Sequence, residues 1–224
     1  MDDLKYICKH CNSALITKNI DNNKKYFCNE CNKSYKIIKN IPRFVNLDNY
    51  SNSFGFQWNK FRKTQLDSYT NLSISKKRVL KATGWENLKL NGKVILEAGS
   101  GAGRFTEILA KTGAIIYSFD YSNAVEANQK NNGLNKNVNF FQGNIFEIPF
   151  KDESFDHVIC LGVIQHTPNP EEAFLALSRA VKKGGQLTID SYRKSLYHLL
   201  RWKYWLRPIT KKIEKQKLFH FISF

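Results

Sequence analysis

VILEAGSGAGRF, at Val94–Phe105, carries the strongest structural signal in this chain of 224 residues. Its first three residues are apolar, as in a buried strand, and glycines then occupy positions 99, 101 and 103. The apolar residues Phe105, Ile108 and Leu109 that follow have the spacing of a helix. The pattern predicts a strand, a tight turn and a helix. A ligand is expected at the turn, because glycines let backbone N–H groups approach it closely.

The glycine spacing favours some ligands over others. A dinucleotide site prefers G-x-G-x-x-G, but the third glycine position holds Arg104 when counted from Gly99 and Thr106 when counted from Gly101. The carboxylate of Glu97 would repel a pyrophosphate and attract an ammonium or sulfonium group. The stretch therefore argues against a nicotinamide dinucleotide.

The segment Glu97–Gly103 (EAGSGAG) resembles motif I of the class I S-adenosylmethionine (SAM) dependent methyltransferases, and the order of later elements is similar to that family through about Tyr192. The resemblance implies an α/β fold with a Rossmann-like sheet. It assigns to the SAM site Glu97, Gly99, Ser100, Gly101 and Gly103. The motif alone leaves open another nucleotide-binding βαβ unit, or a glycine turn without a ligand.

The second predicted strand, Ile115–Phe119, ends in Asp120, which stands 21 positions after Gly99. A carboxylate there can accept two hydrogen bonds from a ribose diol. In class I methyltransferases the acidic residue at this place binds the SAM ribose, and the resemblance implies that role for Asp120. Tyr121 is expected to border the adenine, ahead of a helix predicted over residues 123–131.

The third predicted strand, Val138–Phe141, leads into Asn144 and Ile145. The family usually has Asp where Asn144 stands, bonding the adenine amino group, and Asn still offers a carbonyl acceptor. The resemblance gives Ile145 a backbone N–H and an apolar contact to the base.

The fourth predicted strand, Phe155–Leu161, precedes Gly162–Pro170, which resembles motif IV of the quinone-biosynthesis (methyltransferase type 11) enzymes. The resemblance implies that the end of this strand faces the methyl group, and Leu161 is assigned to the cofactor site. His166 is the leading candidate for a base or a substrate-orienting residue, because an imidazole can take a proton near neutral pH. The alternative is that His166 caps the following helix or bonds local backbone. Cys160, inside the strand, is interpreted as a small core residue.

The last predicted elements of the sheet domain are a helix from Pro170 that ends at Lys182–Gly185 and a fifth strand at Gln186–Ile189. Asp190 and Tyr192 follow, at the edge where open α/β sheets bind ligands. Tyr192 is therefore a second catalytic candidate, and Asp190 a candidate for substrate contact.

Four of the five cysteines form two C-x-x-C pairs, Cys8 with Cys11 and Cys28 with Cys31, with 16 residues between the pairs. Each pair can turn two thiolates onto one tetrahedral ion, and a module of about 40 residues has too small a core to fold without such a staple. Zinc is the expected ion. An iron–sulfur cluster has the same ligands, and disulfides are less favoured in a cytoplasmic protein. The spacing predicts a structural zinc ribbon over residues 1–46.

Residues 47–91 are expected to form a helical connector, with one helix over about 75–83. In the family that the chain resembles, this segment commonly lies over the cofactor and substrate pocket. Candidates for such a lid are Phe54, Gln57, Trp58 and Gln65. The alternative is that the aromatic side chains only pack the connector onto the sheet. The SAM-binding domain then spans residues 92–192.

Charge is concentrated at the ends of the chain. Residues 1–46 hold nine Lys or Arg against four Asp or Glu, and residues 193–217 hold nine against one, within a formal net charge of +16. Basic ends can attract RNA or an anionic membrane surface. The alternative explanation for the many lysines is codon bias, without a binding role. The sixth and seventh strands usual in the family are not recognised after Tyr192. Residues 193–224 are therefore interpreted as a basic, aromatic helical tail, either truncated or an insertion that contacts substrate, membrane or RNA.

The sequence shows no signal peptide and no run of about 18 apolar residues, so a cytoplasmic protein is expected, with its oligomeric state left open. The preferred function is SAM-dependent methyl transfer to a small-molecule or glycan acceptor, because the acceptor-side motifs resemble those of quinone and natural-product enzymes. The alternatives are an RNA base methyltransferase and a non-catalytic module that binds SAM or a partner.

Overall fold

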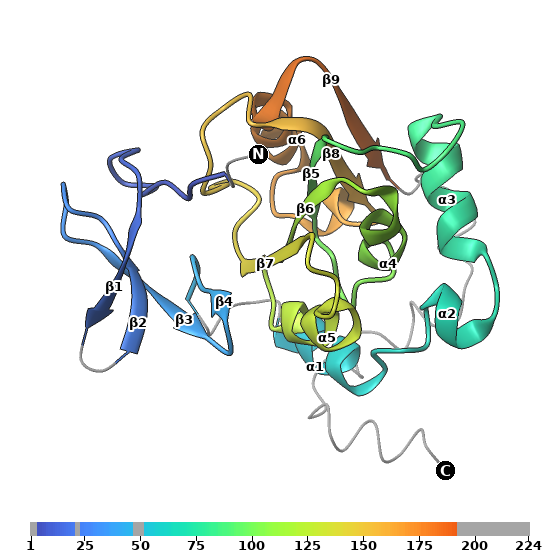
Figure 1. Cartoon of the computed structure of the whole chain (residues 1–224), viewed down its shortest axis with the longest axis horizontal. Helices are drawn as coiled ribbons and strands as arrows, with labels where there is room; N and C mark the ends of the chain where they lie inside the picture. Colours follow the sequence, from blue (N-terminus) through green and yellow to red (C-terminus); the bar gives the residue numbers. More distant parts are fainter. Residues whose placement is uncertain (1–3, 21–22, 47–51, 192–224) are drawn as a thin grey trace. The chain divides into compact units, whose positions relative to one another are not determined.

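The computed structural model describes residues 4–20, 23–46 and 52–191 (Figure 1). These residues belong to one compact unit that ends at Ser191. They form a four-stranded antiparallel sheet and a five-stranded parallel sheet. Within these ranges, no helix combines the length and the apolar character that a membrane crossing requires.

The parallel sheet has the strand order β7-β6-β5-β8-β9. Its strands are β5 (Val94–Ala98), β6 (Ile115–Asp120), β7 (Val138–Gln142), β8 (Phe155–Leu161) and β9 (Val181–Asp190). The chain starts at the central strand β5, winds outward to β7 and then crosses to β8, so the strand order reverses beside β5. Because all neighbours are parallel, the carboxyl ends of the strands lie at one edge, where such sheets bind ligands. The predicted Rossmann-like α/β fold is confirmed.

Helices connect the strands and precede the sheet. They are α1 (Asn52–Lys60), α2 (Asp67–Thr70), α3 (Ile74–Thr83), α4 (Thr106–Leu109), α5 (Ala124–Asn132) and α6 (Pro170–Ala180). Local sequence explains their ends. The Asn169 side chain accepts a hydrogen bond from the N–H of Glu172, and Pro170 is the first residue of α6. Helix α3 ends at Thr83, as the sequence predicted, and the next residue, Gly84, caps it with a left-handed φ of 70°.

The two faces of the parallel sheet carry separate cores. On one face, Ile95 belongs to a buried cluster with Val79 of α3 and Leu109 of α4. On the other face, Leu96 belongs to a cluster with Leu177 of α6 and with residues of the amino-terminal module. The amino-terminal module therefore takes part in the core of the sheet domain.

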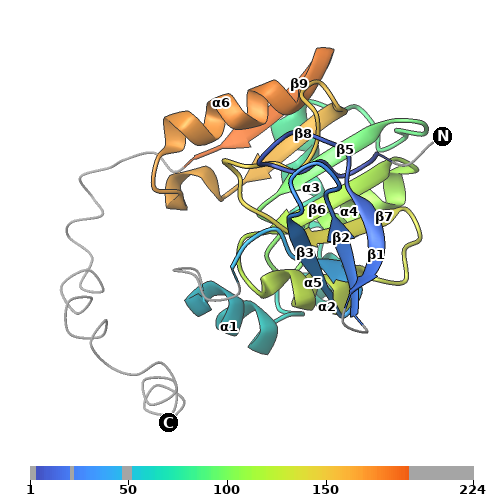
Figure 2. The ribbon, with the colours of Figure 1, turned by 90° about the vertical axis from the view of Figure 1, so that its left-hand side faces the viewer.

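The amino-terminal module is an antiparallel ribbon, hereafter the ribbon (residues 4–20 and 23–46), with four strands in sequential order. Its first three strands lie side by side (Figure 2). They are β1 (Ile16–Ile20), β2 (Asn23–Phe27), β3 (Ser34–Ile38) and β4 (Ile41–Pro42). The ribbon is joined to the sheet domain by backbone hydrogen bonds from Ile7 N to Pro149 O, at 3.0 Å, and from Phe44 N to Gln142 O, at 2.9 Å.

Aromatic side chains fill the space between the ribbon and the sheet. The ring of Tyr6 lies 5.7 Å from that of Phe141 and 4.8 Å from that of Phe150, measured between centroids. The connection from β7 to β8 that carries Phe150 contains no helix. The ribbon therefore covers part of the sheet face that a helix in this connection would otherwise cover.

The fifth strand differs from its prediction. Helix α6 ends at Ala180, and Lys182–Gly185, predicted to end the helix, lie inside β9. Val181 is already extended and pairs with Phe155 of β8, which ends the helix earlier. The glycines instead accommodate a register shift between the Phe155 and His157 pairs, where Gly184 has a φ of +75°. Tyr192 and the predicted helical tail at 193–224 lie outside the described residues.

Candidate cofactor and acceptor site

The glycine turn (Gly99–Gly103) is held by hydrogen bonds to the next strand. The N–H groups of Gly99 and Ser100 both donate to Phe119 O at 2.9 Å. Gly99 has a φ of +77°, and a Cβ there would lie 2.4 Å from Val163. Gly103 has a φ of +88°, and a Cβ there would lie 2.0 Å from Oδ1 of Asn128. Only glycine fits these two positions without a shift of neighbouring atoms.

Asp120 lies at the carboxyl end of β6, beside the glycine turn. Its Oδ2 accepts a hydrogen bond from Gly101 N at 2.9 Å, and its Oδ1 accepts from Ser122 N at 2.8 Å and Ser122 Oγ at 2.6 Å. A carboxylate has about four acceptor positions, so Oδ2 keeps capacity for a further donor. Burial raises the pKa of Asp120, and the Ser122 and Gly101 donors oppose that shift.

Glu97 lies beneath the glycine turn and is 2% exposed. Its Oε2 accepts hydrogen bonds from Thr106 Oγ1 at 2.5 Å and from Ser118 Oγ at 2.7 Å. Asn128 Nδ2 donates to both of these hydroxyl oxygens, at 2.8 and 2.9 Å. Burial raises the pKa of Glu97 to about 7, against the lowering effect of the two hydroxyl donors.

Two buried polar atoms at this site have no hydrogen-bond partner among the described residues: Glu97 Oε1 and Ser100 Oγ. Buried polar atoms are nearly always paired in folded proteins, so unpaired ones beside a glycine turn point to a ligand with polar groups. These atoms, together with the Asp120 carboxylate, fit a ligand such as SAM, which carries a ribose diol and an ammonium group.

The three residues that the sequence predicts to border the adenine lie just after the ends of β6 and β7: Tyr121, Asn144 and Ile145. The carbonyl of Tyr121 accepts a hydrogen bond from Gln142 Nε2 at 2.9 Å. Asn144 Oδ1 accepts from Phe146 N at 3.2 Å, so this side chain also stabilises the turn that follows. Ile145 is 7% exposed.

The connector contacts the glycine turn through α1. A Cβ added at Gly101 would lie 3.4 Å from the indole of Trp58, so this ring lies against the turn. Asn59 Nδ2 donates to Asn123 O at 2.9 Å, which joins α1 to the start of α5. Gln57 is exposed, and the side chain of Phe54 lies outside the described atoms. Gln65, also exposed, accepts from Arg104 Nη1 at 2.9 Å.

Leu161 and Asp190 lie at the carboxyl ends of β8 and β9. Leu161 is 5% exposed. One oxygen of Asp190 accepts from Gly162 N, and the other forms an ion pair with Arg78 Nη2 at 2.5 Å. Sequence analysis did not select Arg78, although it lies in the predicted connector helix, because nothing in the sequence shows that this face of α3 meets β9.

The loop after β8 carries the acceptor-side candidates. His166 is exposed and ends the short 3-10 helix Ile164–His166. The side-chain amide of Gln165 is buried, and both of its polar atoms lack a hydrogen-bond partner among the described residues. Sequence analysis did not select Gln165. Cys160 is fully buried, and burial raises its pKa to about 12, which agrees with its interpretation as a core residue.

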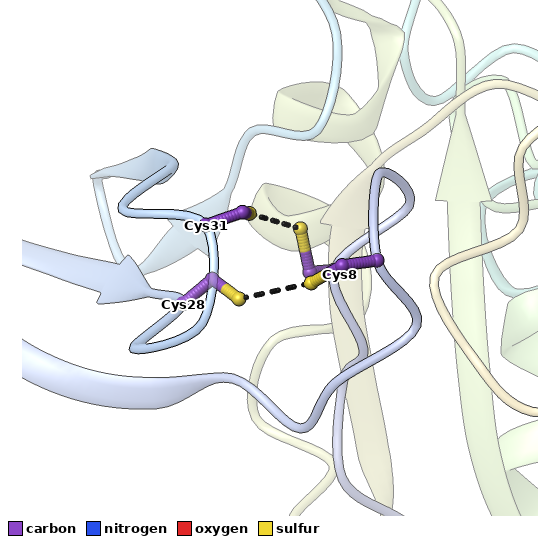
Figure 3. Close-up of side chains that lie close together, drawn as sticks. Cys8, Cys28 and Cys31 are labelled. Atoms are coloured by element: carbon purple, nitrogen blue, oxygen red, sulfur yellow. Dashed lines mark hydrogen bonds between the residues drawn. The ribbon is translucent and has the colours of Figure 1, made fainter.

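The four cysteines of the ribbon converge. Their Sγ atoms all lie within 4.8 Å of one another, with Cys8 and Cys31 at 3.4 Å and Cys11 and Cys28 at 3.3 Å (Figure 3). The two knuckles have similar backbones. Asn12 N donates to Cys8 O and Asn32 N to Cys28 O, at 2.8 and 3.0 Å, and both Asn residues have a left-handed φ.

This cluster fits one tetrahedral zinc ion. A Zn–S bond of about 2.3 Å in tetrahedral geometry separates the sulfurs by roughly 3.8 Å, close to the observed spacing. Zinc would link the knuckle before β1 to the knuckle between β2 and β3. It would thereby supply the fold stability that the small core of the ribbon lacks.

Part of the sheet domain is similar to known proteins. Residues 96–189 match the family model described as a methyltransferase domain. A ubiquinone biosynthesis O-methyltransferase from Coxiella burnetii is 31% identical over 132 residues, which are 56% of this chain and 56% of the relative. Another, from Hahella chejuensis, is 30% identical over 141 residues, 60% of this chain and 59% of the relative. The chain thus spans little more than half the length of these curated relatives.

Solved structures share the fold. A putative S-adenosyl-L-methionine-dependent methyltransferase from Methanococcus maripaludis has a TM-score of 0.51 and 21% identity, covering 80% of this chain and 84% of that one. The complex of a Haloferax volcanii methyltransferase activator with a putative methyltransferase has a TM-score of 0.56 and 18% identity, covering 71% and 68%.

Replacement of Cys28 by Ser should lower the zinc content of the purified protein from one ion per chain and lower its melting temperature, because one of four thiolate ligands is lost. Metal analysis and thermal unfolding are the measurements. Cys160→Ala is the matched control and should keep the zinc, since Cys160 lies outside the cluster. Equal metal content in both variants would contradict the zinc assignment.

Glu97→Gln should gain stability over the wild type as pH rises. Burial raises the pKa of Glu97 to about 7 in the folded protein, above its ordinary value of 4.5, so the folded state holds the proton between these pH values. The wild type therefore loses stability from about pH 4.5 to pH 7, by about 3 kcal/mol in total. Chemical unfolding between pH 5 and pH 8, without SAM, measures the difference. The exposed Glu86→Gln serves as control, and an offset between wild type and Glu97→Gln that does not change with pH would contradict this account.

Proposed function

We infer that this chain transfers a methyl group from SAM to a small-molecule acceptor, because residues 96–189 match the family model described as a methyltransferase domain. The observation that carries this inference is the Asp120 carboxylate, which is bonded to the glycine turn through Gly101 N and keeps acceptor capacity on Oδ2. A ribose diol that reaches this carboxylate has its sugar fixed beside the glycine turn.

We assign the remaining cofactor contacts by position. The backbone of Gly99–Gly103 and the unpaired Ser100 Oγ would face the amino-acid part of SAM, while Tyr121, Asn144 and Ile145 would border the adenine. Trp58, which lies against Gly101, would shield the cofactor from solvent. Water exclusion and positioning are the main demands that this reaction makes on a protein.

SAM supplies an electrophilic methyl group on a sulfonium. In the proposed reaction the acceptor oxygen forms a bond to the methyl carbon, the carbon–sulfur bond breaks, and its electron pair stays on the sulfur of S-adenosylhomocysteine. A base takes the proton of the acceptor hydroxyl. His166, in the loop that follows β8, can fill this role. The buried amide of Gln165, which precedes it, can orient a polar group of the acceptor.

The curated relatives support the acceptor class, because their names specify O-methylation in ubiquinone biosynthesis. Their similarity supports a hydroxyl on a small molecule. A glycan hydroxyl fits the same chemistry. RNA as the acceptor would be favoured instead if the protein bound RNA with an affinity that falls steeply with salt concentration. Methylation assays with radiolabelled SAM and acceptors of each class would separate these outcomes.

Asp120→Ala should weaken binding of S-adenosylhomocysteine by at least about tenfold, because hydrogen bonds to a charged group contribute about 1.5–3 kcal/mol each. Calorimetric titration of the zinc-replete protein measures the dissociation constant. Asp152→Ala removes an exposed carboxylate and should bind as the wild type does. No binding by folded wild-type protein would overturn the proposed function.

His166→Ala should lower kcat by about a hundredfold while the dissociation constant of S-adenosylhomocysteine stays unchanged, because general-base catalysis acts on the acceptor proton. His166→Gln separates the two proposed roles: it keeps a hydrogen bond but cannot take the proton. Retained activity in His166→Gln would indicate orientation of the acceptor, and retained activity in His166→Ala would exclude His166 from catalysis. His10→Ala, at an exposed histidine of the ribbon, is the control.

A further inference from the structure

The ribbon extends the edge of the parallel sheet at a position next to the expected adenosine site. Strand β4 lies beside β7 (Figure 1), and Arg43, which follows β4, forms a parallel bridge with Gln142. Phe44 N donates to Gln142 O at 2.9 Å. Gln142 is the last residue of β7, so the ribbon joins the sheet at the ligand-binding end of this strand.

Arg43 is a buried cation at this junction. It is 4% exposed, and burial lowers its pKa, an effect that Glu126 opposes. Its guanidinium donates from Nη1 to Gln142 Oε1 and from Nη2 to Glu126 Oε1, both at 2.9 Å. Burying a charge is costly unless it is paired and hydrogen-bonded, so these partners are restricted to a narrow geometry.

Gln142 links Arg43 to the segment that contains Asp120, the carboxylate expected to bind the ribose. Its side chain, fully buried, accepts from Arg43 and donates from Nε2 to Tyr121 O at 2.9 Å. Its backbone pairs in register with Asp120 of β6. One residue, Gln142, thus lies between the ribbon and the two residues expected to hold ribose and adenine: its side chain contacts Tyr121 and its backbone pairs with Asp120.

The second partner of Arg43 lies on the other side of the same residues. Glu126 is in the first turn of α5, which begins directly after the segment from Asp120 to Asn123. Lys39 of the ribbon also contacts Glu126, at 2.7 Å. Residues 120–123 are therefore tied to the ribbon at both ends, by Gln142 and by Glu126.

We propose that Arg43 is a positioning residue through which the ribbon fixes Asp120 and Tyr121 for the adenosine half of SAM. This proposal rests on the proposed function. The guanidinium of Arg43 contacts Gln142 and Glu126, and Arg43 acts on Asp120 and Tyr121 through these two residues. The ribbon then contributes to cofactor affinity as well as to stability.

Arg43→Met tests the proposal, because it keeps an unbranched apolar stem and removes the guanidinium. We expect the dissociation constant of S-adenosylhomocysteine and the KM for SAM to rise by about tenfold, the cost of one hydrogen bond to a charged group. We expect kcat at saturating SAM to stay within about twofold, since the acceptor side at β8 and β9 is unchanged. Calorimetry and steady-state kinetics are the measurements.

Tyr117→Phe is the matched control. It removes two other hydrogen bonds between ribbon and sheet, from Leu4 N to Tyr117 Oη at 2.8 Å and from Tyr117 Oη to Leu4 O at 3.5 Å. They lie at a position that leads neither to Gln142 nor to Glu126. It should leave the affinity for S-adenosylhomocysteine unchanged. Loss of affinity in both variants, or in neither, would show that Arg43 only attaches the ribbon and would overturn the proposal.

Arg43→Lys provides a second variant if Arg43→Met does not fold. A lysine keeps the charge near Glu126 but cannot donate to two partners in the planar geometry of a guanidinium. If both variants fold, the proposal is supported when Arg43→Lys binds S-adenosylhomocysteine more weakly than the wild type and more tightly than Arg43→Met. If only Arg43→Lys folds, the proposal is supported when Arg43→Lys binds S-adenosylhomocysteine more weakly than the wild type. Wild-type affinity in a folded Arg43→Lys overturns it. If the wild type binds S-adenosylhomocysteine and the Arg43 variants bind equally well, only this inference fails and the proposed function stands.

Discussion

Hydrogen bonds from the backbone of the glycine turn to the carboxyl end of β6 hold the two main parts of the candidate cofactor site together. Gly99 and Ser100 donate to Phe119 O, and Gly101 donates to the side chain of Asp120. The turn that would receive one end of the cofactor and the carboxylate that would receive the ribose are thereby held in one geometry. This arrangement requires β5 and β6 to be parallel neighbours, because only then do both strand ends meet at the same edge.

Beneath the turn, the protein keeps a polar network in place of a hydrophobic core. Glu97, Thr106, Ser118 and Asn128 bond to one another, and Asn132 donates to Gly103 O at 3.0 Å. Buried polar groups specify one geometry when they are satisfied, and they are costly when they are not. The raised pKa of Glu97 is the electrostatic consequence of that burial.

The ribbon is part of the same architecture. Tyr6 packs on Phe141 and Phe150 across the sheet face, and Arg43 reaches the end of β7. The four cysteines lie in the knuckles of the ribbon, so an ion bound there would stabilise the surface that packs on the parallel sheet. The cysteine cluster and the candidate cofactor site belong to one compact unit.

The sequence by itself determined the five strands of the parallel sheet, the glycine turn and the two C-x-x-C pairs. These features depend on local patterns: apolar runs, glycine spacing and the spacing of metal ligands. It also located Asp120 at a strand end. The start of β9 was missed, because pairing of Val181 with Phe155 outweighed the local signal of Lys182–Gly185. Only the tertiary structure revealed the contacts of Arg78 with Asp190 and of Arg43 with Gln142, which are 112 and 99 residues apart in sequence. Such contacts depend on which helix face or strand edge meets which partner, and this is decided by packing of the whole chain.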